Sequence, residues 1–319
     1  MAATVSESAP AAAGPRRRSS APESLKDQNL RRQRRLAYWF LTPTLIGIGL
    51  FTLIPMVASI VLAFFSWDII STPKFVDLKN FATIATSPTI RVSFLNTFGF
   101  VIVAVILQLV IALGLAVLVQ TKMPGWLRGF FRSAFFFPLI LSAASVSLIM
   151  SYLFNEDFGT INKILALIGL GPVKWLSTAG GAMVVTIIVY VWQNFGFTFL
   201  LFIGGLSSIP ADVYEASSID GASGWSQFSR ITLPLVSPTM LVASVMAIIS
   251  ALQIFDQPYV LTRGGPGDST RTAVMVIYQS AFTELHFGLA AAIGLVLMLI
   301  IMLATWAQFK LSSKFVFYM

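Results

Sequence analysis

The chain has 319 residues, of which 56% are hydrophobic and only 11% are charged, with a mean hydropathy of +0.83. Soluble proteins carry about 25% charged residues, so this composition indicates a membrane protein with several spans. The net charge of +8 does not favour nucleic-acid binding, because the basic residues gather in an N-terminal tail and in loops beside apolar runs. The absence of cysteine excludes disulfides and thiolate metal sites.

Residues 1–35 are rich in Ala, Pro, Ser and Arg and have few apolar side chains. Such a segment cannot bury a core, so we expect a disordered basic tail. Positive charge before an apolar run is also typical of a signal peptide. The run from Leu36 to Phe65 is much longer than the roughly 7–15 residues of a cleaved core, and no clean cleavage site follows it. We interpret it as a retained first membrane helix, bent at Pro43 or Pro55, with an outer loop that completes residues 36–91.

Five further apolar runs have about the 20 residues that a helix needs to span a bilayer. They are approximately Val92–Val119, Ser133–Phe154, Ala182–Leu206, Pro238–Phe255 and Phe287–Phe309. The run that begins at Pro238 is short, and we expect it to extend toward Tyr259. The predicted fold is an all-α membrane protein with six transmembrane helices, a core over residues 92–310 and a short end over residues 311–319.

Small residues recur at four-residue spacing within these runs. Examples are Ala112 with Ala116, and Gly288 with Ala292. Because small side chains let helix backbones approach closely, these positions are predicted to pack against helices of this subunit or of a partner permease. The alternative is that each pair is ordinary apolar filler.

The distribution of Lys and Arg predicts the orientation of the spans. If the N-terminus is inside, the inner segments carry 14 basic residues and the outer loops carry 7. Cytoplasmic loops hold the excess of positive charge, so both termini are predicted to be cytoplasmic. The polar segment between the fourth and fifth spans then also faces the cytoplasm.

That polar segment, residues 210–236, has the local signals of a helix, a turn and a second helix. Pro210 suits a first helical position, and Gly221 can adopt the left-handed conformation that ends a helix. Ser223 is a candidate N-cap for the second helix, and Pro234 is expected to stop that helix before the next span.

The same segment resembles the EAA motif of permease subunits of ABC importers. The matching residues are Glu215, Ala216, Asp220, Gly221, Ala222, Phe228, Ile231 and Pro234, and Ser217 stands where Ala is usual. The resemblance implies the ABC importer type I permease fold, in which this segment forms coupling helices that dock on a cytoplasmic ATPase subunit. It also implies that this chain transmits motion but is not an enzyme, since the partner uses the ATP and Mg and the chain itself needs no cofactor.

Two groups of polar and aromatic residues are candidates for a substrate pathway. They are Trp192, Gln193, Asn194 and Phe197 in the fourth span, and Gln253, Phe255, Asp256 and Gln257 at the outer end of the fifth. Amides and carboxylates bond sugar hydroxyls, and aromatic rings cover the apolar faces of sugars. The alternative is that the amides join helices and the rings form an interfacial belt.

The residues after the second group form a turn rich in Gly and Pro. The stretch around Thr262, Gly264, Gly265 and Pro266 resembles the Leu-Thr-x-Gly-Gly-Pro loop of carbohydrate permeases of the maltose and glycerol-phosphate type. In that group the loop faces the external binding protein, so the resemblance implies the same role here.

Several other classes lack the residues that they require. No ionisable residue lies in the middle of a predicted span, which argues against a carrier driven by an ion gradient. No phosphate-binding Gly-x-x-x-x-Gly-Lys-Ser/Thr loop is present, and His286 is the only histidine, so neither ATP hydrolysis nor metal or triad chemistry is expected.

The sequence therefore predicts one permease subunit of a binding-protein-dependent ABC importer in the bacterial plasma membrane. The expected substrate is a di- or oligosaccharide such as trehalose or maltose, moved by alternating access. The expected partners are a second permease, two ATPase subunits and an external solute-binding protein. The alternatives are an ABC permease for another solute, such as glycerol-phosphate or amino acids, and an ATP-independent facilitator.

Overall fold

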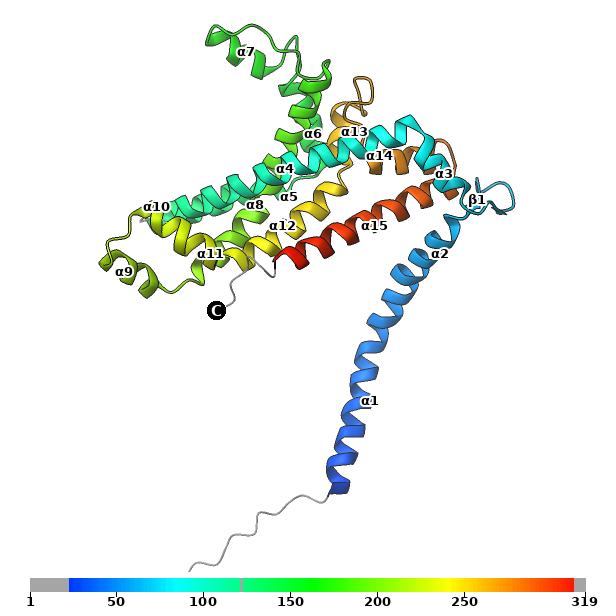
Figure 1. The fold of residues 1–319 in the computed structure, drawn as a ribbon, viewed down its shortest axis with the longest axis horizontal. Helices are drawn as coiled ribbons and strands as arrows, with labels where there is room; N and C mark the ends of the chain where they lie inside the picture. Colours follow the sequence, from blue (N-terminus) through cyan, green and yellow to red (C-terminus); the bar gives the residue numbers. More distant parts are fainter. Residues whose placement is uncertain (1–22, 121–122, 313–319) are drawn as a thin grey trace, which may run out of the picture. The chain divides into compact units, whose positions relative to one another are not determined.

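The computed structural model describes residues 23–120 and 123–312, which are almost entirely helical (Figure 1). The chain divides into two compact units, residues 1–58 and 59–319. The helical elements of the first unit begin with α1 (Glu23–Ile48) and a π-helical turn, η1 (Gly49–Leu53), and continue into α2 (Ile54–Leu62). Residues 31–62 are long and apolar enough to cross a membrane, which confirms the predicted first span.

This first helix differs from its prediction at its N-terminal end. It begins at Glu23, so residues 23–35 are helical rather than disordered, because Leu, Lys, Gln and Arg, all good helix formers, dominate this stretch. The expectation for residues 1–22 lies outside the described residues. Pro43 lies inside α1, and Pro55 is the second residue of α2. The π-helical turn before it ends with a bond from the Ile54 N–H to the Gly49 carbonyl.

The second unit begins within α2, after which a short antiparallel pair forms from β1 (Phe65–Ser66) and β2 (Lys74–Phe75), with Phe65 opposite Phe75. The helix α3 (Lys79–Thr86) follows. The Asn80 amide of α3 donates to the carbonyls of Ala63 and Phe65, at 2.8 and 2.9 Å, and so joins α3 to the residues between α2 and the end of β1.

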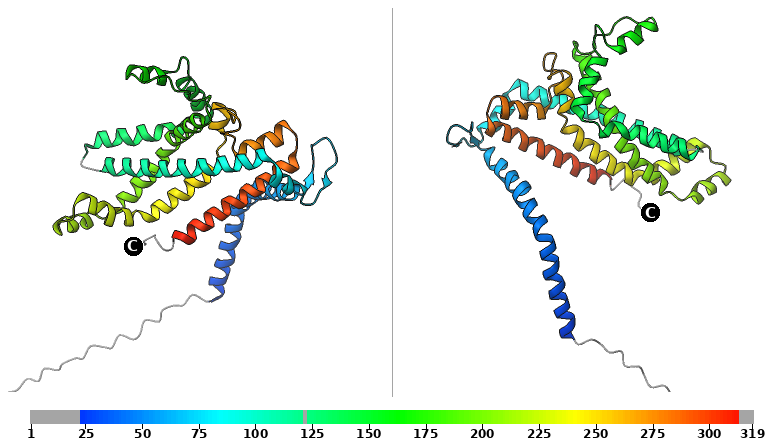
Figure 2. Two further views of the ribbon diagram at one scale, coloured as in Figure 1. Left: turned by 45° about the horizontal axis from the view of Figure 1, so that its top comes forward. Right: turned by 180° about the vertical axis from the view of Figure 1, so that it is seen from behind.

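The bundle of the second unit contains α4 (Pro88–Gln120), α8 (Ala179–Ser207), α12 (Ser237–Leu252) and α15 (Phe287–Ser312), which run side by side (Figures 1 and 2). The helices α5 (Gly125–Ile140) and α6 (Ala143–Leu153) are bent by 98° at a short break. Within the described residues five helices can span a membrane, or six if this bent pair is one span. The predicted all-α fold is confirmed, and so are the predicted spans except Ser133–Phe154, which this bend divides between α5 and α6.

Shorter elements lie at the two ends of this bundle. At one end are α9 (Ala211–Ile219), α10 (Gly224–Gln227), the π-helical turn η2 (Phe228–Thr232) and α11 (Leu233–Leu235). At the opposite end are α13 (Asp256–Leu261), α14 (Ala273–Tyr278) and the π-helical turn η3 (Gln279–Thr283), and α7 (Thr160–Leu167) belongs to the α6–α8 connection (Figure 1). The polar segment 210–236 and the Gly-Gly-Pro loop therefore lie at opposite ends of the bundle.

Close helix packing holds the bundle together. Ala112 and Ala116 of α4 are fully buried in a cluster with Phe199 and Phe202 of α8, as their spacing predicts. At Gly288 of α15, any side chain would meet the Phe65 carbonyl. These small residues mark the places where backbones approach most closely.

A glycine substitution tests this packing. At Gly196 of α8 a Cβ would collide with the Phe135 carbonyl, whereas at Gly204 of the same helix no neighbour lies within 4 Å. We expect Gly196→Ala to destabilise the protein by about 1–3 kcal/mol through overpacking. Gly204→Ala, the matched control, should be neutral or stabilising because Ala favours the helix. Thermal unfolding in detergent measures both, and equal effects would contradict the assigned contact.

Candidate functional sites

A polar cavity of about 310 Å³ lies where α8, the α5–α6 break and the α12–α13 break meet. It brings the two predicted groups together. Its lining consists of Leu139, Leu141, Ala143, Tyr190, Gln193, Asn194, Ser250, Gln253, Ile254, Phe255, Asp256 and Gln257. Six of the eight predicted pathway residues thus share one space, although they come from segments about 60 residues apart.

The buried amides at this cavity form a chain of hydrogen bonds. Gln193 donates to the Leu141 carbonyl at 3.0 Å, and its own carbonyl oxygen accepts from the Gln257 amide at 2.9 Å. Gln193 and Gln257 are only 5% and 6% exposed. Because Leu141 directly follows the end of α5, Gln193 satisfies a carbonyl that the helix break leaves without a helical partner. Gln193 therefore joins three segments.

The exposed side chains of the cavity are the groups available to a ligand. Ser250, Gln253 and Asp256 are exposed, and Asn194 is half-buried, with its amide donating to the Tyr190 carbonyl at 2.9 Å. Phe255 adds an aromatic face and stacks on Tyr259, with ring centroids 4.9 Å apart. The cavity therefore combines amides, a hydroxyl, a carboxylate and an aromatic ring.

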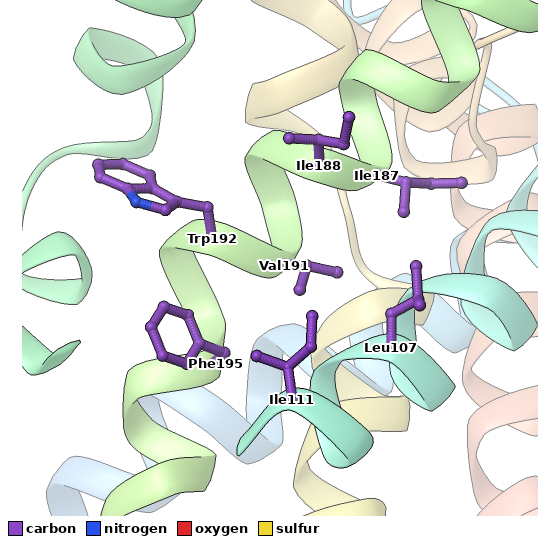
Figure 3. Close-up of a pocket in the computed structure, with 7 residues that line it drawn as sticks. All are labelled: Leu107, Ile111, Ile187, Ile188, Val191, Trp192 and Phe195. Carbon is purple, nitrogen blue, oxygen red and sulfur yellow. The ribbon is translucent and has the colours of Figure 1, made fainter. Parts of the chain in front are cut away.

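Trp192 and Phe197 are not part of this cavity. Trp192 instead lines an apolar hollow of about 260 Å³ between α4 and α8, and Figure 3 shows it with Leu107, Ile111 and Phe195. Phe197 is 40% exposed and does not line the polar cavity. The cause is helical geometry, because neighbouring residues of a helix point about 100° apart and only one face of α8 meets the cavity.

Two kinds of lining residue were missed from the sequence. Ser250, near the end of α12, lies three residues before Gln253, the C-cap of that helix, and this spacing indicates that the two lie on the same side of the helix end. Leu139, Leu141 and Ala143 line the cavity because of the α5–α6 break, which the apolar run alone does not reveal.

The segment 210–236 forms the expected pair of short helices. Gly221 has a φ of +74° and so ends α9 in the left-handed conformation. Ser223 caps α10 by accepting from the Ser226 N–H at 3.3 Å, as predicted. Pro210 is the N-cap of α9, one position before its predicted place.

Side-chain hydrogen bonds tie the two short helices to each other. The Gln227 amide lies 3.0 Å from both the Ser217 and the Ser218 hydroxyl oxygens, and the Tyr214 hydroxyl lies 3.0 Å from that of Thr232. Ser217, the departure from the EAA motif, is buried and so gains a partner that Ala would lack. The pair is therefore held as one rigid unit.

The prediction that Pro234 ends the second helix is wrong. The helix continues from η2 through α11, and α12 begins at Ser237 after a single turn residue. In η2 the Leu233 N–H bonds to the Phe228 carbonyl, five residues back. Because this shift changes the hydrogen-bond ladder just before Pro234, the proline is accommodated without a break.

The outer surface of this helix pair is both acidic and apolar. Asp212, Glu215, Ala216 and Asp220 are exposed, and Ile219 and Trp225 are 87% and 76% exposed. A groove of about 580 Å³ beside them is lined by Ser217, Asp220, Gly221, Ala222, Ser223, Ser226, Arg230 and Ile231. Large exposed apolar side chains beside a groove are typical of a surface that binds another protein.

The Gly-Gly-Pro loop at the other end is held by a compact set of hydrogen bonds. The fully buried Thr270 bonds the Thr262 hydroxyl at 2.5 Å and the Gly265 carbonyl at 3.0 Å. Gly264, with a φ of +88°, accepts from the Thr270 N–H, and Pro266 follows a cis peptide bond. The amide of Asn96 on α4 donates to the Asp268 carbonyl at 2.7 Å, which anchors the loop to the bundle.

The connection between α6 and α8 is also closed by side-chain bonds. The Glu156 carboxylate accepts from the Ser177 N–H and hydroxyl, both at 2.8 Å, and from the Leu176 N–H at 3.1 Å. The Ser177 hydroxyl and N–H hold the pKa of Glu156 below its usual value, since they stabilise the charged form. Asn162 in turn accepts from the Trp175 ring N–H at 2.9 Å.

This arrangement of helices is a known fold. A solved bacterial ABC transporter involved in the import of the acidic polysaccharide alginate contains a chain with this fold, with a TM-score of 0.79 at 22% identity. The match covers 92% of this chain and 99% of the other.

The chain belongs to the family of binding-protein-dependent transport system inner membrane components, whose model matches residues 108–316. It is 33% identical over 278 residues to the probable ABC transporter permease YurN of Bacillus subtilis, with 86% of this chain and 95% of the relative covered. It is 34% identical to the multiple sugar-binding transport system permease MsmF of Streptococcus mutans, covering 87% and 96%. The chain is therefore a membrane component of a transport system and not a catalytic subunit.

The amide chain can be tested by stability. Gln257→Leu removes the donor to the buried Gln193 oxygen, and we expect a loss of about 1–3 kcal/mol in the free energy of unfolding. Gln253→Leu, in the same cavity but exposed, should change stability by less than about 0.5 kcal/mol. A double-mutant cycle with Gln193→Leu measures the coupling, and additive effects would contradict the contact.

Proposed function

We propose that this chain is one of two permease subunits of an ATP-driven importer that takes up a sugar, most simply a di- or oligosaccharide such as trehalose or maltose. The observation that carries the proposal is the polar cavity, where two distant groups of amides, a carboxylate and an aromatic ring meet between apolar helices. The likeness to a multiple sugar-binding permease supports the same substrate class.

The cavity chemistry suits a sugar better than an ion or an apolar solute. Amides such as Asn194 and Gln253 both donate and accept hydrogen bonds, as sugar hydroxyls do. Phe255 offers a flat apolar face to a sugar ring. Trp192 and Phe197, which face elsewhere, are assigned to packing against lipid or a partner subunit.

We assign the segment 210–236 to coupling with the ATPase subunits. Glu215 and Ala216 lie on the exposed surface of α9, and Ile219 and Trp225 supply apolar area for docking. Because Gln227 bonds α10 to α9, the two helices move together when the ATPase displaces them, and the movement is transmitted to α12. In this proposal Gly221 and Ala222 form the turn, Asp220 lines the groove, and the partner binds the ATP and Mg.

We assign the loop of Thr262, Gly264, Gly265 and Pro266 to contact with the external solute-binding protein. The loop follows α13, whose first residues line the cavity. A movement of the loop on contact with the binding protein therefore reaches the cavity through one short helix. The family itself is described as binding-protein-dependent, which supports such a partner. Both termini are cytoplasmic and the membrane is the bacterial plasma membrane in this proposal.

The experiment that tests the assembly is purification of the tagged chain in mild detergent. We expect it to bring down a second permease and an ATPase, and we expect ATPase activity to rise with one sugar and its binding protein. Isolation of the chain alone, still moving sugar in liposomes without ATP, would replace the importer with a facilitator. Stimulation by an amino acid and by no sugar would change the substrate class.

The coupling assignment predicts the effect of a single charge reversal. Glu215→Lys should reduce uptake by about tenfold or more. The new positive charge would meet either a like charge or no partner on the docked ATPase surface. Insertion into the membrane and recovery of the second permease should be unchanged, while recovery of the ATPase falls. Glu215→Gln, the matched control without reversal, should have a smaller effect. Normal uptake by Glu215→Lys would remove Glu215 from the docking surface.

A further inference from the structure

The polar cavity carries an uncompensated negative charge. Among the described residues that line it, Asp256 is the only carboxylate, and none is Lys, Arg or His. Every other polar side chain there is an amide, a hydroxyl or a phenol. The electrostatic character of the cavity is therefore set by one group.

The Asp256 side chain lines the cavity and is open to a ligand there, and its place in the first turn of α13 also suits the positive end of that helix. Asp256 is the first residue of α13, directly after the break that separates α12 from α13, and it is exposed. Asp256 belongs neither to the ion pair of Arg271 with Asp268 nor to that of His286 with Glu284. Arg271, which follows the next loop, is occupied by Asp268 and by the Gln279 side chain.

We infer that this cavity selects for the charge of its substrate: it accepts uncharged sugars and rejects carboxylated, phosphorylated or sulfonated ones. The Asp256 carboxylate accepts hydrogen bonds from sugar hydroxyls and repels an anionic substituent, while the nearby amides serve either ligand alike. This inference rests on the proposed function and adds to it the substrate's charge and the residue that selects for it.

The fold alone does not decide this property. The solved transporter with the same fold imports an acidic polysaccharide, so the architecture is compatible with anionic cargo. The difference must then lie in the side chains of the cavity, and here these provide no cation to pair with an acid. Asp256 is the position that tests it.

The test compares matched neutral and anionic sugars on the intact assembly without its solute-binding protein, so that the selectivity of that protein does not enter. The pairs are maltitol with maltobionate, which share an open-chain second residue, and trehalose with trehalose 6-phosphate. Saturation-transfer NMR detects weak binding. For the wild-type protein we expect the neutral member of a pair to bind at least about tenfold more tightly.

Two substitutions of Asp256 separate charge from shape. Asp256→Asn keeps the size and removes the charge, and we expect the preference for the neutral sugar to fall at least about fivefold. Asp256→Glu keeps the charge and should retain most of the preference. Asp157→Asn, in the connection between α6 and α8 and outside the cavity lining, is the control and should leave the ratio unchanged. Each variant is first checked for assembly by size-exclusion chromatography.

The possible results are distinct. Equal binding of the neutral and anionic members by the wild-type protein, or an unchanged ratio in Asp256→Asn, would overturn the inference and leave the sugar importer intact. Binding of none of the four sugars, with ATPase stimulation only by a non-sugar solute, would overturn the proposed function and the inference with it. A ratio that shifts with Asp256→Asn and not with Asp256→Glu supports both.

Discussion

The central part of the structure depends on the two hydrogen bonds of the Gln193 side chain. Inside an apolar bundle an unsatisfied polar group costs several kcal/mol, which favours a partner for both the N–H and the oxygen of a carboxamide. Gln193 meets this constraint by bonding to Leu141 at the α5–α6 break and to Gln257 on α13. The same contacts keep two helix breaks at one level of the bundle. The broken helices leave room for a polar cavity, and the amide chain defines its wall.

The two ends of the bundle are rigid for a related reason. At one end Gln227 and Tyr214 lock the short helices of the segment 210–236, and at the other Thr270 and Asn96 lock the Gly-Gly-Pro loop. Stiff elements at both ends fit a subunit that transmits movement between an ATPase and a binding protein. The π-helical turns η2 and η3 lie next to these ends, and such turns are frequent at functional sites.

The sequence predicts those features of the fold that depend on local or one-dimensional rules. Hydropathy locates the spans, and the turn at Gly221 and the cap at Ser223 follow from backbone conformation. The rule for Pro234 failed because a π-helical turn changed its context, and residues 23–35 are helical although their charge favoured disorder. The sequence does not predict which residues line the cavity, since this depends on which face of α8 turns inward and on the break after Ile140. That is why Asn194 lines the cavity and Trp192 does not.

The most direct test of the account is whether the polar cavity is the path of the sugar. The chain contains no cysteine, so a single introduced thiol reports on one position. We would place cysteine at Gln253, which lines the cavity, and at Phe197, which does not, and measure the rate of reaction with a charged thiol reagent during transport. The account predicts that sugar slows the labelling of the first position and leaves the second unchanged. Labelling at Gln253 that is indifferent to sugar, in an assembly that still transports it, would contradict the account.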